Sequence, residues 1–282
     1  MHVLVAGCGW LGQAVAAQLV ARGDRVTAVR SDPARAEATR APGIEPLTLD
    51  LADPAALERI PLDLDAILAL QAPRGGHEAA YRRAYLEANE TLLAAARRRP
   101  LRALVLTGST GIFGQRDGSE VEETTVPVLT TIPSLVLAEA EGLMLAAAAE
   151  GLPTRIVRLS GLYGPGRLWM LDRMRRGLLA LGPGDGAWLN SCHRDDAVAT
   201  VLAALDRGRP GALYHATDAE PLRRRDLIHH LAARLGVAPA CSEAEAAGGP
   251  DRRVLGRQTR AELRLELRWP SLREGLEPYL QS

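Results

Sequence analysis

Residues 2–12 of the chain read HVLVAGCGWLG, and this stretch decides the fold. The run Val3–Ala6 is apolar, as expected of a strand that is buried on both faces of a sheet. It leads directly into Gly7, Gly9 and Gly12, and the residues that follow have the composition of a helix. A GxGxxG pattern between a strand and a helix is typical of a Rossmann-type dinucleotide site.

Each glycine of this loop has its own physical role. Gly7 permits the tight turn, Gly9 lets a diphosphate approach the backbone, and Gly12 lets the helix pack closely on the strand. The backbone N–H groups of the first helical turn face the phosphates, and the helix dipole favours their negative charge there. We therefore expect Gly7, Gly9, Trp10, Leu11 and Gly12 to bind the diphosphate of the cofactor.

The end of the second strand indicates which dinucleotide is bound. Arg30 stands about twenty residues after the glycines, with Ser31 next and Arg35 one helical turn further on. An acidic residue at this place would bind the ribose hydroxyls of NAD, whereas a guanidinium can pair with the 2′-phosphate of NADP. We expect NADP(H), bound by these three residues, with NAD less favoured. Asp32 keeps the NAD alternative open, although it also suits the N-cap of the next helix.

Further cofactor contacts are expected where the third and fourth strands end. Asp50 and Leu51 close the third strand, and Leu70, Gln71 and Ala72 lie at the end of the fourth. The carboxyl ends of parallel strands meet at one sheet edge, where such folds bind their ligands. Asp50 could reach the adenine or, alternatively, cap the helix that follows.

The alternation of apolar strands with helical runs predicts an α/β fold with a Rossmann-type, doubly wound parallel sheet. The expected strands are His2–Ala6, Arg25–Arg30, Glu45–Leu49, Ala66–Leu70, Ala103–Thr107, Thr154–Leu159 and Ala212–His215. The expected helices are Leu11–Arg22, Pro33–Thr39, Pro54–Arg59, His77–Arg98, Ser134–Glu150, Asp195–Arg207, Arg223–Leu235 and Thr259–Leu265.

Two domains are expected from the change of pattern near residue 160. Residues 1–165 would form the NADP-binding Rossmann domain, and residues 190–215 would return to it. Gly and Pro cluster after residue 160 in LYGPGR and LGPGDG. Residues 166–189 and 216–282 would then form a small C-terminal α/β lobe that binds the substrate.

Composition narrows the class of protein. The 282 residues contain 34 basic and 34 acidic side chains, so the formal net charge is zero and offers no long-range positive field to nucleic acid or to an anionic membrane. The cysteines, Cys8, Cys192 and Cys241, form no CxxC pair, so we expect neither a disulfide framework nor a metal site. Without a signal peptide or an apolar run of ~20 residues, the expected place is the cytoplasm. A small-molecule substrate is the expected partner, with a homodimer left open.

Five segments together resemble a known family. They are GCGWLG (7–12), LTGSTGIFG (106–114), VRLSGLYGPGR (157–167), LNSCHRDDAVA (189–199) and RAELRLELRWPSLREGL (260–276). In this order they resemble the extended short-chain dehydrogenase/reductases, which are the NAD-dependent epimerase/dehydratase family, and especially its atypical YeeZ-like members. The resemblance covers nearly the whole chain.

The resemblance suggests catalytic residues, because the family uses a set of Asn, Ser or Thr, Tyr and Lys. Asn89 is similar to the family's Asn, which steadies the active-site backbone; the alternative is an Asn on the helix surface. Ser109 is similar to the hydroxyl that orients the substrate's carbonyl or hydroxyl group, and Thr110 could share this task. The alternative for Ser109 is a serine that caps a turn.

The sequence departs from the family at its YxxxK motif. The Tyr position falls on Ser134 and the Lys position on Ala138. A serine hydroxyl is much harder to ionise than a phenol, whose reference pKa is about 10. All 34 basic residues of the chain are arginine, so no lysine can come from elsewhere. The family's ordinary tyrosine-based hydride-transfer mechanism is therefore excluded.

Two other residues are candidates for the proton. Tyr163 follows the sixth strand, and His193 is similar to the histidine of the family's HxDD segment, with a pKa useful near neutrality. The alternative for His193 is a structural histidine bonded to the backbone before the next helix. The sequence thus predicts an NADP(H)-dependent oxidoreductase or epimerase/dehydratase-type enzyme on a small, sugar-like substrate. A non-catalytic NADP(H)-binding sensor is the alternative.

Overall fold

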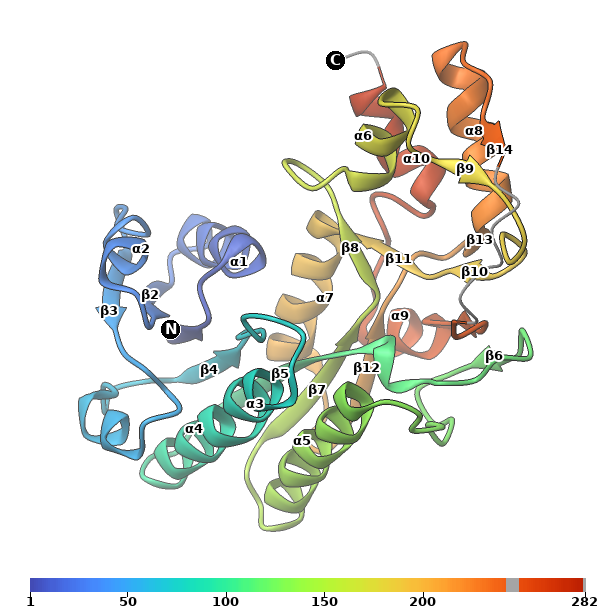
Figure 1. Cartoon of the computed structure of the whole chain (residues 1–282). Coiled ribbons are helices and arrows are strands. Elements are labelled where there is room, and N and C mark those ends of the chain that lie inside the picture. Colours follow the sequence, from blue (N-terminus) through green and yellow to red (C-terminus); the bar gives the residue numbers. More distant parts are fainter. Residues whose placement is uncertain (242–248, 281–282) are drawn as a thin grey trace. The chain divides into compact units, whose positions relative to one another are not determined.

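The computed structural model describes residues 1–241 and 249–280. Its largest sheet is parallel, with seven strands in the order β12-β7-β5-β4-β1-β2-β3 (Figure 1). These strands are β1 His2–Ala6, β2 Arg25–Arg30, β3 Ile44–Thr48, β4 Ala66–Ala69, β5 Ala103–Ser109, β7 Thr154–Leu159 and β12 Leu213–Ala216. The predicted Rossmann-type α/β fold is confirmed.

The strand order reverses beside β1. This strand pairs with β2 on one side, His2 opposite Arg25, and with β4 on the other, Val3 opposite Ala66. The residues Val3–Ala6 are fully buried, which explains why these four positions are apolar. A doubly wound sheet binds its ligand where the order reverses, so the loop after β1 lies at the expected crevice.

Helical segments connect the strands of the sheet and continue after its last strand. The first part of the chain contains α1 Trp10–Ala21, α2 Pro33–Glu37, η1 Pro54–Arg59, α3 Glu78–Arg82, η2 Arg83–Glu87, α4 Ala88–Arg97, η3 Thr110–Ile112 and α5 Ile132–Ala149. The later part contains α6 Trp169–Arg175, α7 Arg194–Arg207, α8 Arg224–Leu235, α9 Arg257–Leu263, α10 Leu272–Leu276 and η4 Glu277–Tyr279. The single helix expected over residues 77–98 is interrupted by the π-helical turn η2.

Two exposed ion pairs link α3 and α4 to α5 and the residue that follows it. Arg82 pairs with Glu139, and Arg97 at the end of α4 pairs with Glu150 just after α5.

By length and composition, α5 is apolar enough to cross a membrane. Its face of Val136, Leu137, Ala140, Met144 and Ala147 is instead buried in the protein, as in the core helix of an α/β fold.

The chain divides into two compact units. The first comprises residues 1–112, 130–158 and 198–214, and the second comprises residues 113–129, 159–197 and 215–282. The expected domains placed residues 113–129, 159–165 and 190–197 with the sheet, whereas here these segments belong to the second unit.

The second unit has its own hydrophobic core and several two- or three-residue strands. Leu171, Leu227, Ile228 and Leu231 are fully buried in this core, around Tyr163. Its strands are β6 Glu120–Val121, β8 Gly161–Tyr163, β9 Ala180–Leu181, β10 Trp188–Leu189, β11 Ser191–His193, β13 Leu222–Arg223, β14 Ala240–Cys241 and β15 Arg253–Val254.

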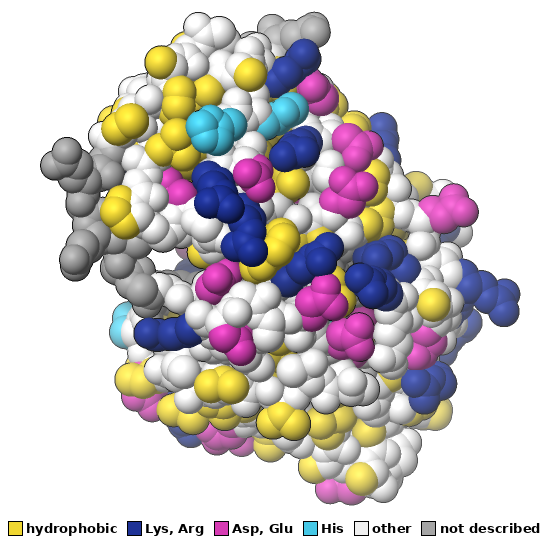
Figure 2. Space-filling model, turned by 90° about the vertical axis from the view of Figure 1, so that its right-hand side faces the viewer, with side chains coloured by type: hydrophobic (Ala, Val, Ile, Leu, Met, Phe, Trp, Pro, Cys, Tyr) yellow, Lys and Arg dark blue, Asp and Glu magenta, His cyan; other side chains and the backbone are white. Residues whose placement is uncertain are grey.

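The surface charges of the chain are mixed. On the face drawn in Figure 2, arginine and acidic side chains lie interspersed. Exposed pairs such as Arg234–Glu277 and Arg253–Glu120 fit this pattern and the zero formal net charge. Such exposed pairs contribute at most about 1 kcal/mol each to stability.

Candidate functional site

The glycine loop is tightly packed on one side and open at its tip. Gly7 has a φ of +80°, and a Cβ atom added there would lie 2.4 Å from Cα of Gln71. A Cβ at Gly12 would lie 2.7 Å from the carbonyl oxygen of Gly7. At Gly9 the nearest atom would be 3.9 Å away. The loop therefore requires glycine at both ends and leaves space at the place where a diphosphate would approach.

Helix α1 begins directly at this open point. Gly9 is its N-cap residue, Trp10 is half-buried, and Leu11 is buried beneath the first turn. Within the described residues, no side chain caps the helix and no acidic residue lies in its first turn. Because the dipole of α1 favours an anion here, the loop and helix fit a dinucleotide diphosphate.

Arg30 lies against the back of the same loop. Its Nη1 donates a hydrogen bond to the carbonyl oxygen of Cys8, at 2.9 Å. Among the residues described, no carboxylate forms an ion pair with Arg30. Burial raises the pKa of the Cys8 thiol to about 11, and the nearby Arg30 charge only partly opposes this. The guanidinium thus provides positive charge at the end of β2, beside the exposed Ser31.

Asp32 is used as a helix cap. Its Oδ1 accepts a hydrogen bond from the backbone N–H of Arg35, at 2.8 Å, and Pro33 follows as the first residue of α2. This confirms the interpretation of Asp32 as the N-cap. The Arg35 side chain itself is exposed.

Asp50 lies in the turn after β3 and forms an ion pair with Arg83. Its Oδ1 also accepts from the backbone N–H of Ala52, at 3.2 Å. The following helix η1 is capped by Asp53 instead, so Asp50 is a turn residue and not the helix cap. Leu51 is buried.

The end of β4 carries a hydrogen-bonded amide pair. Nε2 of Gln71 donates to Oδ1 of Asn89 at 2.8 Å, and Nδ2 of Asn89 donates to the carbonyl oxygen of Tyr85 at 2.7 Å. Asn89 is fully buried, so the alternative of a surface asparagine is wrong. Leu70 is buried beside Gln71, whereas Ala72 is exposed.

Ser109 closes β5 at the same edge of the sheet. Its Oγ accepts a hydrogen bond from the backbone N–H of Gly111, at 3.0 Å, as a turn-capping serine does. The side chain is half-buried, and this acceptor role leaves its O–H group free to donate. Thr110 is buried in the short helix η3. Ser109 therefore has the better access to a ligand.

Ser134, where the sequence resemblance puts the family's tyrosine, has a structural use in this chain. Ser134 is buried at the start of α5 and forms a capping box with Thr131. Its Oγ accepts from the N–H of Thr131 at 3.0 Å, while the Thr131 side chain accepts from the N–H of Ser134 at 3.2 Å. Ser134 is therefore committed to the helix start.

A buried ion pair, not expected from the sequence, lies behind Ser109. Arg158 in β7 donates to both carboxylate oxygens of Glu141 in α5, at 2.8 Å each. The Glu141 carboxylate lies beside the backbone of Gly108, 3.5 Å from where a Cβ atom would stand. The only sequence signal is a glutamate on the apolar face of a helix, and nothing in the sequence identifies its partner. The pair ties α5 and β7 together behind the end of β5.

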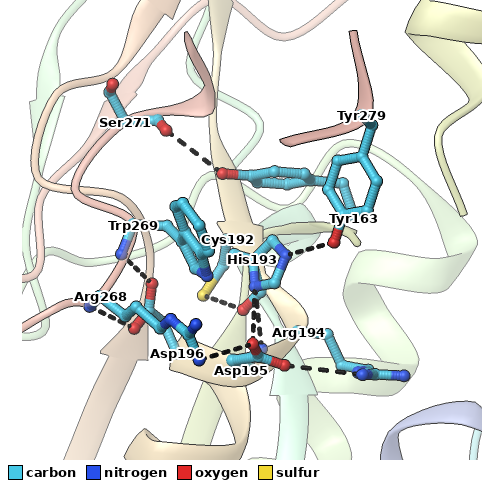
Figure 3. Close-up of polar contacts among 10 residues, drawn as sticks. All are labelled: Tyr163, Cys192, His193, Arg194, Asp195, Asp196, Arg268, Trp269, Ser271 and Tyr279. Atoms are coloured by element: carbon cyan, nitrogen blue, oxygen red, sulfur yellow. Dashed lines mark hydrogen bonds and ion pairs between the residues drawn. The ribbon is translucent and has the colours of Figure 1, made fainter. Parts of the chain in front are cut away.

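His193 belongs to the second unit and is a cap for the start of α7 (Figure 3). Its Nδ1 accepts from the backbone N–H of Asp195, at 3.1 Å, so the proton of the neutral ring is on Nε2, 3.4 Å from the hydroxyl of Tyr279. Burial lowers the pKa of His193, although Asp195 partly opposes this. These contacts favour the alternative of a structural histidine bonded to the backbone.

Tyr163 lies in the same cluster and packs edge-on against the ring of His193. Its hydroxyl donates to the carbonyl oxygen of Ser271, at 3.3 Å. A Cβ atom at Gly275 would lie 2.1 Å from this hydroxyl, so Tyr163 fits closely against α10. Burial strongly raises the pKa of Tyr163. Its surroundings therefore do not support the expectation that it donates a proton to a substrate.

Two buried aspartates complete this cluster. Asp196 accepts from the backbone N–H groups of Arg268 at 2.8 Å and Trp269 at 2.9 Å, which holds the C-terminal segment against α7 (Figure 3). Asp218 is 3% exposed, and burial raises its pKa well above the usual range. The nearby Asp196 raises it further, while a hydrogen bond from the backbone of His193 opposes the shift. Asp196 thus connects the C-terminal segment with residues near His193 inside the second unit.

Comparison with known proteins gives the same fold and related enzymes. The chain is 28% identical over 273 residues to the protein YeeZ of Escherichia coli, covering 95% of this chain and 96% of YeeZ. It is 31% identical to a 3-diazoavenalumate denitrifying reductase of Streptomyces, covering 85% of this chain and 83% of the reductase. A dTDP-glucose 4,6-dehydratase of Streptomyces venezuelae, solved with NAD bound, superposes with a TM-score of 0.85, at 21% identity, over 100% of this chain and 96% of that one.

These relatives indicate an enzyme of the epimerase, dehydratase or reductase type that binds NAD(P). The model of the NAD dependent epimerase/dehydratase family matches residues 3–216, which include the glycine loop, Asn89, Ser109 and His193. The chain belongs to the NAD-dependent epimerase/dehydratase family.

Proposed function

We propose that this protein is an NADP(H)-dependent reductase that acts on a carbonyl group of a small polar substrate. The observation that carries the proposal is the open glycine loop before α1, with the guanidinium of Arg30 hydrogen-bonded to its carbonyl oxygen at Cys8. An uncapped helix start attracts a diphosphate, and the charge beside it attracts one further phosphate.

The preference for NADP over NAD rests on the charges at the end of β2. Arg30 has no acidic partner among the described residues, and Ser31 and Arg35 are exposed next to it. The nearest acidic side chain in sequence, Asp32, is hydrogen-bonded to the backbone of α2. A 2′-phosphate would therefore meet positive charge and a hydroxyl, while the carboxylate that would suit NAD is otherwise engaged.

The catalytic proposal assigns Ser109 to the substrate. When bound, the cofactor supplies the hydride, and the protein supplies geometry and hydrogen bonds. Oγ of Ser109 accepts from Gly111, so its O–H group can donate to a substrate carbonyl oxygen at the end of β5. With Ser134 engaged in a helix cap and Tyr163 buried against Ser271, we assign the proton to solvent water.

The class of substrate is a proposal drawn from related enzymes. The names 3-diazoavenalumate denitrifying reductase and 2-alkyl-3-oxoalkanoate reductase both describe reductions, and the second names an oxo group. These relatives support a reducible small molecule. A sugar-like substrate, as the sequence resemblance implies, stays a prediction.

The test combines binding with turnover. Calorimetric titration of the full chain is expected to give tighter binding of NADPH than of NADH. A panel of ketones, aldehydes, oxo acids and sugar nucleotides is then offered with NADPH, and absorbance at the nicotinamide band is followed. Turnover should fall by about 100–1000-fold in Ser109→Ala, as when one hydrogen-bond donor to a developing oxyanion is removed. Absence of binding to either dinucleotide would refute the proposal.

The second candidate is a non-catalytic NADP(H) sensor. Its supporting observation is the Ser134–Thr131 cap at the start of α5, where the sequence resemblance puts the family's tyrosine and the chain has no phenol. Tight NADPH binding without turnover across the substrate panel would favour this candidate over the reductase.

A further inference from the structure

The amide pair at the end of β4 has only one consistent orientation. Nδ2 of Asn89 donates to the carbonyl oxygen of Tyr85, which lies in the π-helical turn η2. Its Oδ1 therefore faces Gln71 and can only accept, so Gln71 must present its Nε2 donor. Because Asn89 is fully buried, this arrangement is fixed by the core of the first unit.

The consequence is an unsatisfied acceptor. With Nε2 of Gln71 directed at Asn89, the Oε1 atom points the other way. Oε1 is buried, and among the residues that the structure describes it has no hydrogen-bond partner. Leaving a buried carbonyl oxygen without a hydrogen-bond donor costs about 1–3 kcal/mol of stability. We therefore expect this atom to accept a hydrogen bond when the protein has its ligand bound.

The position of Gln71 at the end of β4 indicates which group donates a hydrogen bond to its Oε1 atom. Cα of Gln71 lies 2.4 Å from the position of a Cβ at Gly7, so the residue borders the glycine loop. In the sheet, β4 lies on one side of β1 and β2 lies on the other. Arg30 at the end of β2 and Gln71 at the end of β4 therefore flank the loop from opposite sides.

A dinucleotide bound along this edge of the sheet runs in one direction only. With its adenosine 2′-phosphate at Arg30 and its diphosphate at the start of α1, its second ribose lies towards β4. The first polar donors beyond the diphosphate in that direction are the hydroxyls of this ribose. Ser109, at the end of β5, follows one strand further along the sheet.

We propose that Gln71 binds the ribose on the nicotinamide side of the cofactor, accepting a hydrogen bond from its hydroxyl at Oε1, and that Asn89 is the positioning residue that aims this oxygen. The inference rests on the proposed NADP(H) function and adds a residue that recognises one half of the ligand. It predicts that Gln71 affects the nicotinamide half and leaves the adenosine half unchanged.

The test compares two ligands by calorimetry. NADPH carries both riboses, while adenosine 2′,5′-bisphosphate carries only the adenosine half. Gln71→Met, which keeps nearly the same volume without hydrogen-bonding groups, should bind NADPH about 5–10-fold more weakly, as expected for one lost hydrogen bond. Its affinity for adenosine 2′,5′-bisphosphate should equal that of the wild type. Gln18→Leu, an exposed glutamine in α1, is the matched control and should change neither affinity.

A double-mutant cycle tests the role of Asn89. Asn89→Leu should lower the ratio of NADPH to adenosine 2′,5′-bisphosphate affinity about as much as Gln71→Met does, and it should lower the ratio no further when Gln71 is already methionine. A purely structural role would weaken both ligands equally and in both backgrounds. Should Asn89→Leu fail to fold, Asn89→Ser is used in the same cycle.

The outcomes separate this inference from the proposed function. If the wild-type protein binds neither NADPH nor NADH, the proposed function fails and this inference fails with it. If the wild type binds NADPH and Gln71→Met binds it equally well, or loses the same factor for both ligands, only the role of Gln71 is refuted.

Discussion

Nη1 of Arg30 lies 2.9 Å from the carbonyl oxygen of Cys8, so the side chain that ends β2 is hydrogen-bonded to the loop that follows β1. This contact holds the partly buried guanidinium next to the start of α1. A charge that is held in place loses less side-chain entropy when it binds a phosphate. Arg30 is therefore the residue of the site whose replacement should change cofactor preference most.

Arg30→Ala should weaken NADPH binding by roughly 10–100-fold, because charged hydrogen bonds to a phosphate are lost. NADH, which has no 2′-phosphate, should bind with nearly unchanged affinity. Calorimetric titration of both cofactors checks the prediction, with Arg59→Ala, an exposed arginine in η1, as the control. An equal loss of affinity for the two cofactors would contradict the assignment of Arg30 to the 2′-phosphate.

Two glycines in helices give a matched test of the loop. At Gly12 in α1 a Cβ atom would lie 2.7 Å from the carbonyl oxygen of Gly7, whereas at Gly142 in α5 it would meet nothing within 4 Å. Gly12→Ala should lower the free energy of unfolding by about 1–3 kcal/mol through overpacking. Gly142→Ala should raise it by up to about 1 kcal/mol, because alanine favours a helix. Urea denaturation measures both, and a stable Gly12→Ala protein would contradict the close packing of the loop.

Local sequence patterns predicted the bounds of several strands and the glycine loop, because the conformation of these segments depends mainly on residues that are neighbours in sequence. The strands His2–Ala6, Arg25–Arg30 and Thr154–Leu159 agree at both ends with the structure, because short runs rich in Val, Ile and Thr between turn-forming residues are typical of strands. The glycine loop was equally predictable, since its backbone conformation requires glycine. Side-chain partners were not predictable in this way, because they depend on which segments meet in space.

Tyr163 and Glu141 illustrate what the sequence could not disclose. Tyr163 follows a strand end and was expected to face a ligand, yet it packs against Gly275, more than a hundred residues later. Glu141 lies in an apolar helix, and its partner Arg158 is in the next strand. Both contacts are set by tertiary packing and leave no periodic signal. The segment 113–129 likewise joins the second unit through pairing of β6 with β15, far along the chain.

The contribution of the buried Glu141–Arg158 pair to stability can be compared with that of an exposed pair. The exposed pair joins Arg97 to Glu150, a glutamate just after α5. Glu141→Gln removes the charge that faces Arg158 in a site where both side chains are under 10% exposed, and it should cost about 3 kcal/mol of stability. Glu150→Gln breaks the pair with Arg97, which is about half exposed, and should cost less than about 1 kcal/mol. Guanidinium denaturation at constant pH compares them. Similar small losses would show that the buried pair contributes no more than the surface pair.

The last prediction concerns pH and the buried Asp218. Because burial raises its pKa in the folded state, the folded protein binds a proton that the unfolded chain has already released, so stability falls as pH rises through the folded pKa. Asp218→Asn removes this titration. The variant should therefore gain stability relative to the wild type as pH rises, by about 1.4 kcal/mol per pH unit within the titration range.

Thermal denaturation of both proteins between pH 4 and pH 9 measures this difference. The lowered pKa of His193 destabilises the folded state as pH falls below its unfolded value of 6.5, but both proteins share this effect and it cancels in the comparison. Asp226→Asn, an exposed aspartate in α8, is the matched control. If the difference in stability between wild type and Asp218→Asn stays constant over the whole pH range, Asp218 is ionised in the folded protein. Its charge would then require a partner other than Tyr163, His193 and Asp196.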